Sequence, residues 1–168
     1  SGSPMFGDNP CCFIFTSSCS SIYPFRACIM FKKGNMKVYF KSTSILKAII
    51  RNIRSSERVY GCIAWVTHPK ILDEMEKIPS ELIMTRHKAN RWKRHIRVKF
   101  LGSGRGRKKE LMHHKFCVGF RGKKPAWLAT GSFNFTKSAC RHYENIMVIE
   151  DPDTAKAFYE EFKRLKDE

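Results

Sequence analysis

Residues 59–75 read VYGCIAWVTHPKILDEM, and this stretch decides the class of fold that we expect. Val59 to Thr67 is a nearly continuous apolar run, which is typical of a strand covered on both faces of a sheet. Pro69 to Met75 then reads as a short helix. A strand followed directly by a helix predicts that the fold is of the α/β class.

The residues on the N-terminal side of this stretch predict a hairpin and a helix. Phe25 to Phe31 and Met36 to Lys41 contain β-branched and aromatic residues, and Lys33-Gly34-Asn35 between them is a turn signal. An amphipathic helix of about 11 residues follows, because apolar residues recur at helical spacing behind three hydroxyl residues that could each cap it. These are Ile45, Leu46, Ile49, Ile50 and Ile53 behind Ser42, Thr43 and Ser44.

The residues on the C-terminal side continue the alternation of strands and helices. Short apolar segments predict strands at Leu82–Thr85, Ile96–Phe100, Phe116–Phe120, Ala126–Ala129 and Asn145–Ile149. A final helix has Asp151 as its N-cap and Pro152 in its first turn, with Phe158, Phe162 and Leu165 on one stripe. We therefore predict one domain over residues 25–168, an α/β sandwich with a mixed central sheet flanked by helices.

The N-terminal residues lie outside this predicted domain. Ser1 to Pro4 precede Met5 and read as a vector-derived scar, and residues 5–24 read as an irregular extension rich in Ser, Cys and Pro. Seven cysteines without framework spacing favour reduced thiols in a cytoplasmic protein. Zinc is the alternative for four of them, although they lack a C-x-x-C pair and a nearby histidine. They are Cys11, Cys12, Cys19 and Cys28.

Polar residues at the entrance of one strand and the exit of another form a candidate site. Met112-His113-His114-Lys115 enters a predicted strand, so side-chain alternation puts His113 and Lys115 on one face and His114 on the other. Thr130 to Asn134 (TGSFN) follow a second apolar strand at its expected turn into a helix. Small residues, a hydroxyl, an amide and backbone N–H groups at such a turn can receive an oxyanion. The two segments together predict a phosphate-binding site.

These motifs resemble those of the phospholipase D superfamily, in particular its small single-motif nucleases, the bacterial Nuc-type endonucleases and the mitochondrial Zucchini-type enzymes. The matching residues are His113-His114-Lys115-Phe116, Gly131 to Lys137 (GSFNFTK) and Glu144-Asn145. The resemblance covers about Lys37 to Leu165 in element order and is specific from Met112 to Asp151. It implies a phospholipase D-like sandwich and an active site that two subunits share across a two-fold axis.

The resemblance also implies a role for each matching side chain. His113 would attack phosphorus and form a phosphohistidine, while the same histidine of the other subunit protonates the leaving oxygen. Lys115 and Asn134 would hold the non-bridging oxygens, with support from Ser132, and Glu144 would orient the catalytic imidazole. Histidine suits both tasks because its ordinary pKa of about 6.5 lets neutral and charged forms coexist near neutrality. This scheme needs no metal or cofactor.

One position departs from the family pattern. The family's Asp falls at position 120, where this sequence has Phe120, and no acidic residue occurs from Phe116 to Ala129. If that Asp shapes the strand and its surroundings, activity can survive its loss. If it sets the charge environment of Lys115, the rate falls.

The formal net charge of +17 predicts a polyanionic partner such as nucleic acid or an anionic membrane surface. Residues 82–109 hold eleven Lys and Arg but no Asp or Glu, and they lead directly into the His113 strand. We expect them to border the catalytic cleft and to follow a phosphate backbone, a solvated basic face being the alternative. The candidate nucleic-acid-binding residues are Arg86, Lys88, Arg91, Trp92, Lys93, Arg94, Arg105, Arg107, Lys108 and Lys109.

Two tryptophans and the remaining histidines are expected to have structural rather than catalytic roles. Trp65 and Trp127 lie inside apolar runs and are expected in the core. His114 is expected to be packed or hydrogen-bonded rather than catalytic. Four histidines without metal-ligand spacing read as surface or loop residues: His68, His87, His95 and His142.

Three functional hypotheses follow from the sequence. The leading one is a homodimeric, metal-independent phosphodiesterase, an endonuclease of low sequence specificity that prefers DNA to RNA, because the basic tract offers backbone contacts but no base-reading element. The second is a phospholipase that acts on anionic lipid such as cardiolipin. The third is a nucleic-acid-binding protein that has lost efficient catalysis. We expect no membrane-spanning helix, since no apolar run approaches the roughly 18 to 20 residues required.

Overall fold

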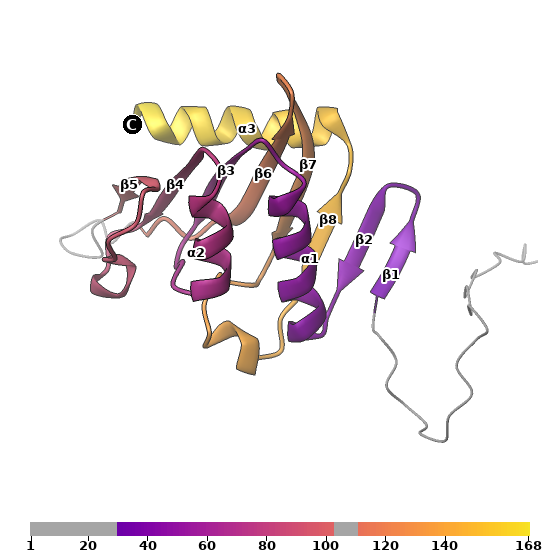
Figure 1. Cartoon of the computed structure of the whole chain (residues 1–168), viewed down its shortest axis with the longest axis horizontal. Helices are drawn as coiled ribbons and strands as arrows, with labels where there is room; N and C mark the ends of the chain where they lie inside the picture. Colours follow the sequence, from indigo (N-terminus) through magenta and orange to yellow (C-terminus); the bar gives the residue numbers. More distant parts are fainter. Residues whose placement is uncertain (1–29, 103–110) are drawn as a thin grey trace, which may run out of the picture.

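The computed structural model of the protein describes residues 30–102 and 111–168 (Figure 1). The expected N-terminal extension, the four-cysteine cluster and residues 25–29 of the first predicted strand lie outside these ranges, as do residues 103–110 of the basic tract and its continuation. The predicted turn at Lys33-Gly34-Asn35 is confirmed, with Gly34 at a φ of 56°. Such a positive φ favours glycine, which has no Cβ to clash with the backbone.

Eight strands form one sheet in the order β1-β2-β8-β7-β6-β3-β4-β5. Strands β3, β4 and β5 run parallel to one another, whereas all the other neighbouring pairs of this described sheet are antiparallel. The strands are β1 (Met30–Lys33), β2 (Met36–Tyr39), β3 (Arg58–Ile63), β4 (Ser80–Thr85), β5 (Arg97–Leu101), β6 (Lys115–Arg121), β7 (Lys124–Gly131) and β8 (Ile146–Ile149). The mixed sheet that the sequence predicts is therefore confirmed.

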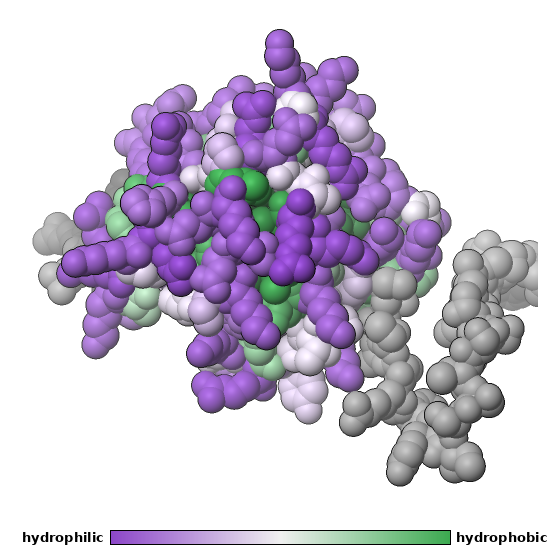
Figure 2. Space-filling model, in the orientation of Figure 1, coloured by the Kyte–Doolittle hydropathy of each residue, from purple (hydrophilic) through white to green (hydrophobic). Residues whose placement is uncertain are grey.

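Helices cover both faces of this sheet (Figure 1). Helices α1 (Ser42–Arg54) and α2 (Pro69–Glu76) pack beside each other on one face, and α3 (Pro152–Asp167) crosses the other face, mainly over β7 and β6. The outer surface of α1 and α2 is mostly hydrophilic (Figure 2), as expected for amphipathic helices that bury one side. Two short 3₁₀ helices, η1 (Lys88–Asn90) and η2 (Ala139–Arg141), lie in loops.

The two faces of the sheet bury separate apolar clusters. One cluster, under α1 and α2, contains Trp127, which confirms its predicted place in the core. The second, under α3, contains Phe116, Phe120 and Phe162. Alternation along β6 assigns its residues to the two clusters, because neighbouring side chains of a strand point to opposite faces.

The helix termini agree with the sequence only in part. In α3, the Asp151 carboxylate accepts a hydrogen bond of 2.8 Å from the backbone N–H of Thr154, so the predicted cap is confirmed. In α1, the N-cap is Lys41 and no side-chain capping hydrogen bond is present in the described structure. The predicted hydroxyl cap is wrong, because the helix begins early enough to take Ser42, Thr43 and Ser44 into its first turn.

The strand directions decide which strand ends meet at one edge of the sheet. Strands β2, β3, β4, β5 and β7 end there, whereas β1, β6 and β8 begin there. Paired residues near this edge include Ile63 with Lys115 and Gly131 with Ile146. Residues that are far apart in the sequence therefore meet just beyond these ends, and we call this region the site edge.

Candidate active site

Lys115 and His113 lie together at the start of β6, as the alternation of the strand predicts. The Lys115 ammonium nitrogen is 3.3 Å from both ring nitrogens of His113, and it donates a hydrogen bond of 3.0 Å to the His113 carbonyl oxygen. The His113 side chain is exposed at the site edge. A cation placed against an exposed imidazole can attract a phosphate to the atom that would attack it.

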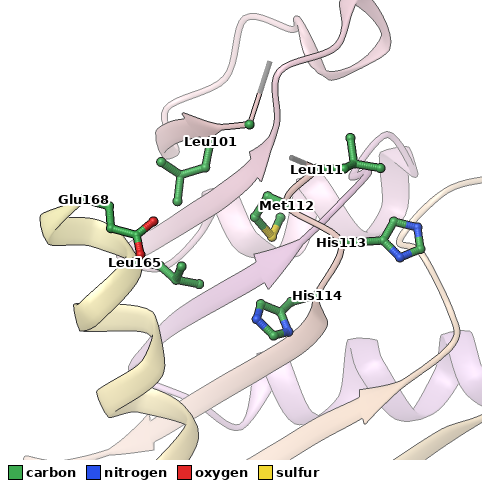
Figure 3. A pocket seen from close by; sticks show the side chains of 8 residues that line it. Leu101, Leu111, Met112, His113, His114, Leu165 and Glu168 are labelled. Carbon is green, nitrogen blue, oxygen red and sulfur yellow. The ribbon is translucent and has the colours of Figure 1, made fainter. Parts of the chain in front are cut away.

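His114 lies on the other side of the chain, toward α3 (Figure 3). Its ring packs edge-on against Phe116 at 5.6 Å between centroids, and its Nε2 is 3.5 Å from a carboxylate oxygen of Glu161. The prediction that His114 is packed rather than placed with Lys115 agrees with these contacts. His113 is thus the histidine that faces the site edge.

Partial burial lowers the pKa of the Lys115 ammonium, and the negative charge of Glu144 opposes that shift. Glu144 reaches this region from the loop that precedes β8. The carboxylate near Lys115 is therefore supplied by Glu144.

Ser132 joins the end of β7 to the start of β8. Its hydroxyl donates to the Glu144 carboxylate and accepts a 3.1 Å hydrogen bond from the Asn145 N–H, while its own N–H donates to the Asn145 carbonyl oxygen at 3.1 Å. Among the hydrogen bonds of the described residues, none joins Glu144 to His113. The structure thus gives Glu144 a contact with Ser132 in place of the expected contact with the imidazole.

Gly131 permits this close approach of β7 and β8. A Cβ atom at Gly131 would lie 2.3 Å from the Asn145 carbonyl oxygen, which is backbone and cannot rotate away. The glycine of the Gly-Ser-x-Asn motif is therefore required by packing, and Ser132 takes its position from it.

Asn134 lines a groove of about 410 Å³ at the site edge, together with Trp65 and Glu144. Its Oδ1 atom is buried and has no hydrogen-bond partner among the described residues. Because the oxygen is the buried end of this amide, the Nδ2 hydrogens are the end available to a ligand. An amide nitrogen facing the groove can donate to a phosphate oxygen.

The turn after β7 does not lead into an α-helix, contrary to the sequence-based expectation. Between β7 and β8 the described structure has only the short helix η2, and the backbone N–H groups of Ser132 and Phe135 donate to the carbonyl oxygens of Asn145 and Trp65. These two N–H groups attach the loop to its neighbours and are therefore not available to bind an anion.

Trp65 is half-buried and lines the groove, so its expected place in the core is wrong. Strand β3 ends at Ile63, two residues earlier, which carries Trp65 out of the sheet. Its ring meets the rings of His113 and His87 edge-to-face, with centroids 5.9 Å and 6.2 Å apart. An apolar run alone could not separate the buried part of this segment from the exposed part.

Asn90 is a buried positioning residue that sequence reasoning missed. Its Nδ2 donates to the carbonyl oxygens of Ala64 and Thr85 at 2.8 Å and 2.9 Å, and its Oδ1 accepts from the Val66 N–H at 3.1 Å. It thereby ties the ends of β3 and β4 together beside Trp65. Nothing in the sequence distinguished it, because it lies within the basic tract.

Phe120 lies far from the reacting groups. It belongs to the cluster under α3, whereas Cys117, which shares strand parity with Lys115, belongs to the opposite cluster. Five residues of strand separate Phe120 from Lys115, or about 16 Å. Its ring packs against Tyr60 and Tyr159 at centroid distances of 5.3 Å and 4.8 Å. The position at which the family has Asp therefore does not touch Lys115.

The predicted nucleic-acid-binding residues differ in their exposure and in the hydrogen bonds that they already make. Arg86, Lys88, Arg91 and Lys93 are exposed near the end of β4 and in the loop after it. Trp92 is half-buried and donates from its indole N–H to the Val66 carbonyl oxygen at 2.8 Å, which limits its freedom to stack on a base. Arg105, Arg107, Lys108 and Lys109 lie outside the described residues.

Arg94 is engaged with acidic residues of α2. Its guanidinium lies 2.9 Å from the Asp73 carboxylate and 2.8 Å from that of Glu76. This side chain attaches the basic loop to α2. Because its charge is already paired with carboxylates, we expect it to contribute less to binding a phosphate backbone than its exposed neighbours do.

The other histidines occupy different environments. His87 and His142 are exposed, as expected, but His68 is 6% exposed, so the expectation of a surface or loop position is wrong for it. The segment before α2 is attached to the loop after β7, since the N–H groups of Thr67 and His68 both donate to the Phe135 carbonyl oxygen.

The described residues contain no group of three His, Cys, Asp or Glu side chains that could hold a metal ion. In the same part of the chain, no helix has the length and apolar character needed to cross a membrane.

Several solved structures have a fold similar to that of this chain. NucT from Helicobacter pylori matches with a TM-score of 0.66 and 17% identity, over 79% of this chain and 95% of that one. Nuc from Salmonella typhimurium, described as a phospholipase D family member, matches with a TM-score of 0.62 and 19% identity, over 77% and 91% of the two chains. TrmBL2, described as an archaeal chromatin protein with a novel mode of DNA binding, matches with a TM-score of 0.55 and 10% identity, over 82% and 54%.

A comparison with curated proteins finds no match for this chain. A family model does match, over residues 36–166, and its description is "Cardiolipin synthase, PLD-like domain". That range includes His113, Lys115 and Asn134 as well as the whole sheet from β2 onward. The chain therefore belongs to the family of phospholipase D-like domains, as the sequence motifs predicted.

Proposed function

We propose that this protein is a metal-independent phosphodiesterase that cleaves nucleic acid, DNA in preference to RNA, with His113 as its nucleophile. Membership of the phospholipase D-like family supports a phosphodiester hydrolase. The observation that carries the proposal is the pairing of Lys115 with His113, 3.3 Å apart, beside a groove that contains Asn134 and Glu144.

The proposed reaction has two steps. An imidazole nitrogen of His113 attacks phosphorus, the bond from phosphorus to the leaving oxygen breaks, and the partner subunit's His113 gives that oxygen a proton. Water then attacks the phosphohistidine, gives its proton back to the partner subunit's His113, and the N–P bond breaks. Lys115 and Asn134 bind the non-bridging oxygens and stabilise their charge in both transition states.

The proposal uses two subunits because, within the described residues, His113 is the histidine whose ring lies against Lys115. His114 faces α3 and contacts Glu161, and the ring of Trp65 lies against both His113 and His87. His87 also accepts a 3.1 Å hydrogen bond from the Ala89 N–H on its Nδ1, which ties that side of the ring to its own loop. A second copy of the chain supplies the missing acid in this proposal.

An assay with a chelator tests the proposed activity. Purified protein in EDTA should degrade plasmid and single-stranded DNA at the rate seen without EDTA, because His113 and Lys115 do the work of a metal here. RNA should be cut more slowly, and sedimentation should show a dimer at the assay concentration. Protein that binds DNA without cutting it, or that stops cutting in EDTA, would contradict the proposal.

Salt dependence tests the proposed nucleic-acid surface. Replacing the exposed Lys88, Arg91 and Lys93 with Ala should flatten the plot of log binding constant against log salt by about 0.7 to 0.9 for each phosphate that the variant can no longer neutralise. Fluorescence anisotropy with a labelled oligonucleotide measures this slope. Arg94→Ala is the matched control, because Arg94 is paired with Asp73 and Glu76 and should change the slope less than the others. Equal slopes for all the variants would exclude this surface.

A phospholipase activity is the second candidate, and one observation favours it. Beside His113 lies a second pocket, of about 440 Å³, whose wall includes Leu101, Leu111, Met112 and Leu165 (Figure 3). Such a wall suits an acyl chain. Vesicles that contain cardiolipin should release phosphatidic acid if this interpretation is correct, and should remain intact if the substrate is nucleic acid.

A further inference from the structure

The groove at the site edge extends beyond the residues of the proposed reaction. Besides Asn134 and Glu144, its lining includes Thr136, Lys137, Ser138 and His142. These four side chains carry hydroxyl groups, an ammonium group and an imidazole. None of them has a part in the two chemical steps proposed above.

Lys137 is a cation available to a ligand. Its side chain is exposed, and it has no acidic partner within the part of the chain that the structure describes, in contrast to Arg94 with its two carboxylates. The charge of Lys137 also reaches the interior. Burial, and then the positive charges of Lys137 and Lys70, lowers the pKa of the nearby buried His68. The part of the groove around Lys137 is therefore electropositive.

The neighbouring hydroxyl groups can complete a binding site for an anion. The Thr136 hydroxyl oxygen accepts a 3.0 Å hydrogen bond from the Ala139 N–H, so its own proton remains to be donated. The Ser138 hydroxyl lies 3.1 Å from the His142 Nε2 atom. When His142 donates to Ser138, the Ser138 proton is also free for a ligand. The acidic group that lines the groove, Glu144, accepts a hydrogen bond from the Ser132 hydroxyl.

We propose that Lys137, Thr136 and Ser138 bind the phosphate that neighbours the scissile phosphate, so that the substrate is a chain of consecutive phosphodiesters. This inference rests on the proposed function, because it places the scissile phosphate at His113, Lys115 and Asn134. Asn134 and Lys137 belong to one loop and line one groove, so a single strand of nucleic acid can contact both with successive phosphates. A cation with adjacent hydroxyl donors is the kind of group that phosphate recognition uses.

Short thymidine substrates test this site. The wild-type rate constants kcat/KM for d(TpT), d(pTpT) and d(TpTp) are compared, since a terminal phosphate on one side or the other reaches the second site. We expect one of the two extended substrates to react about tenfold faster than d(TpT), which is the usual effect of a charge-assisted hydrogen bond. Lys137→Ala should remove that gain and leave hydrolysis of d(TpT) and of bis(p-nitrophenyl) phosphate unchanged.

Control variants separate this site from general effects of charge. Lys137→Arg should keep most of the gain, and Lys124→Ala, which removes an exposed lysine at the far end of the β6–β7 hairpin, should keep all of it. The inference is overturned if neither terminal phosphate raises kcat/KM above that of d(TpT), or if the increase persists in Lys137→Ala. In both cases the proposed function stands. Absence of hydrolysis of every diester overturns the proposed function. In that case, calorimetric titration with d(pTpT), d(TpTp) and d(TpT) still measures binding at the second phosphate site. Equal affinities of wild type and Lys137→Ala for the extended substrates would refute that site.

Discussion

Replacing His113 with Asn is expected to lower kcat for phosphodiester hydrolysis by about 10⁴-fold or more, because the variant has neither a nucleophile nor an acid. The same protein should bind oligonucleotide with nearly unchanged affinity, since Lys115 and the exposed basic residues remain. A plasmid-nicking assay and an anisotropy titration measure the two quantities on one preparation.

The matched control is His114→Asn, which alters the adjacent histidine on the α3 side of the chain. It should keep wild-type kcat, because His114 contacts Glu161 and Phe116. An equal fall in activity in the two variants would show that the effect does not arise from a nucleophile at His113.

The proposed sharing of one active site by two subunits can be tested separately by subunit exchange. After subunit exchange with about a tenfold excess of His113→Asn protein, wild-type activity should fall to about a tenth, whereas a monomeric enzyme would keep it.

Replacing Phe120 with Ala is expected to lower the free energy of unfolding by about 3–5 kcal/mol, the usual cost of removing a buried Phe ring. Phe120 is 5% exposed, and it contacts Tyr60 and Tyr159 in the cluster under α3. The kcat of the folded variant should equal that of wild type, because the ring lies on the face of β6 opposite Lys115. Urea denaturation gives the stability, and kcat is measured well below the unfolding midpoint.

Phe120→Leu is the milder companion, and it should cost less stability with the same unchanged kcat. A fall in kcat in a fully folded variant at position 120 would mean that this position controls the charge of Lys115 after all. The structure argues otherwise, because the carboxylate that acts on Lys115 is that of Glu144. If kcat is unchanged in both variants at position 120, efficient catalysis in the wild type needs no Asp at this position.

The elements that could be predicted are those with a strong local pattern. The β1–β2 turn at Gly34, the apolar stripe of α1 and the Asp151 cap of α3 each depend on a few neighbouring residues. The pairing of His113 with Lys115 is of the same kind, because strand alternation alone brings their side chains together. The cap of α1 was missed because three successive hydroxyl residues give no unique helix start.

The parts of the site that could not be predicted depend on contacts between distant segments. Trp65 reads as a core residue within its apolar run, and only the end of β3 at Ile63 exposes it to the groove. Asn90 acts through hydrogen bonds to Ala64, Val66 and Thr85, none of which its own neighbourhood in the sequence reveals. His68 is likewise buried, although its own segment of sequence reads as a loop, and its backbone N–H donates to the distant Phe135 carbonyl oxygen.

The sequence by itself determined the α/β class, the family and the pair His113–Lys115, since these rest on periodicity, motif and strand alternation. Tertiary structure alone decided that Glu144 rather than residue 120 provides the charge near Lys115, and that Lys137 faces the same groove as Asn134. The physical reason is the order of strands in the sheet. Antiparallel pairing of β6, β7 and β8 gathers their site-edge ends from distant parts of the chain, and a linear pattern carries no such distances.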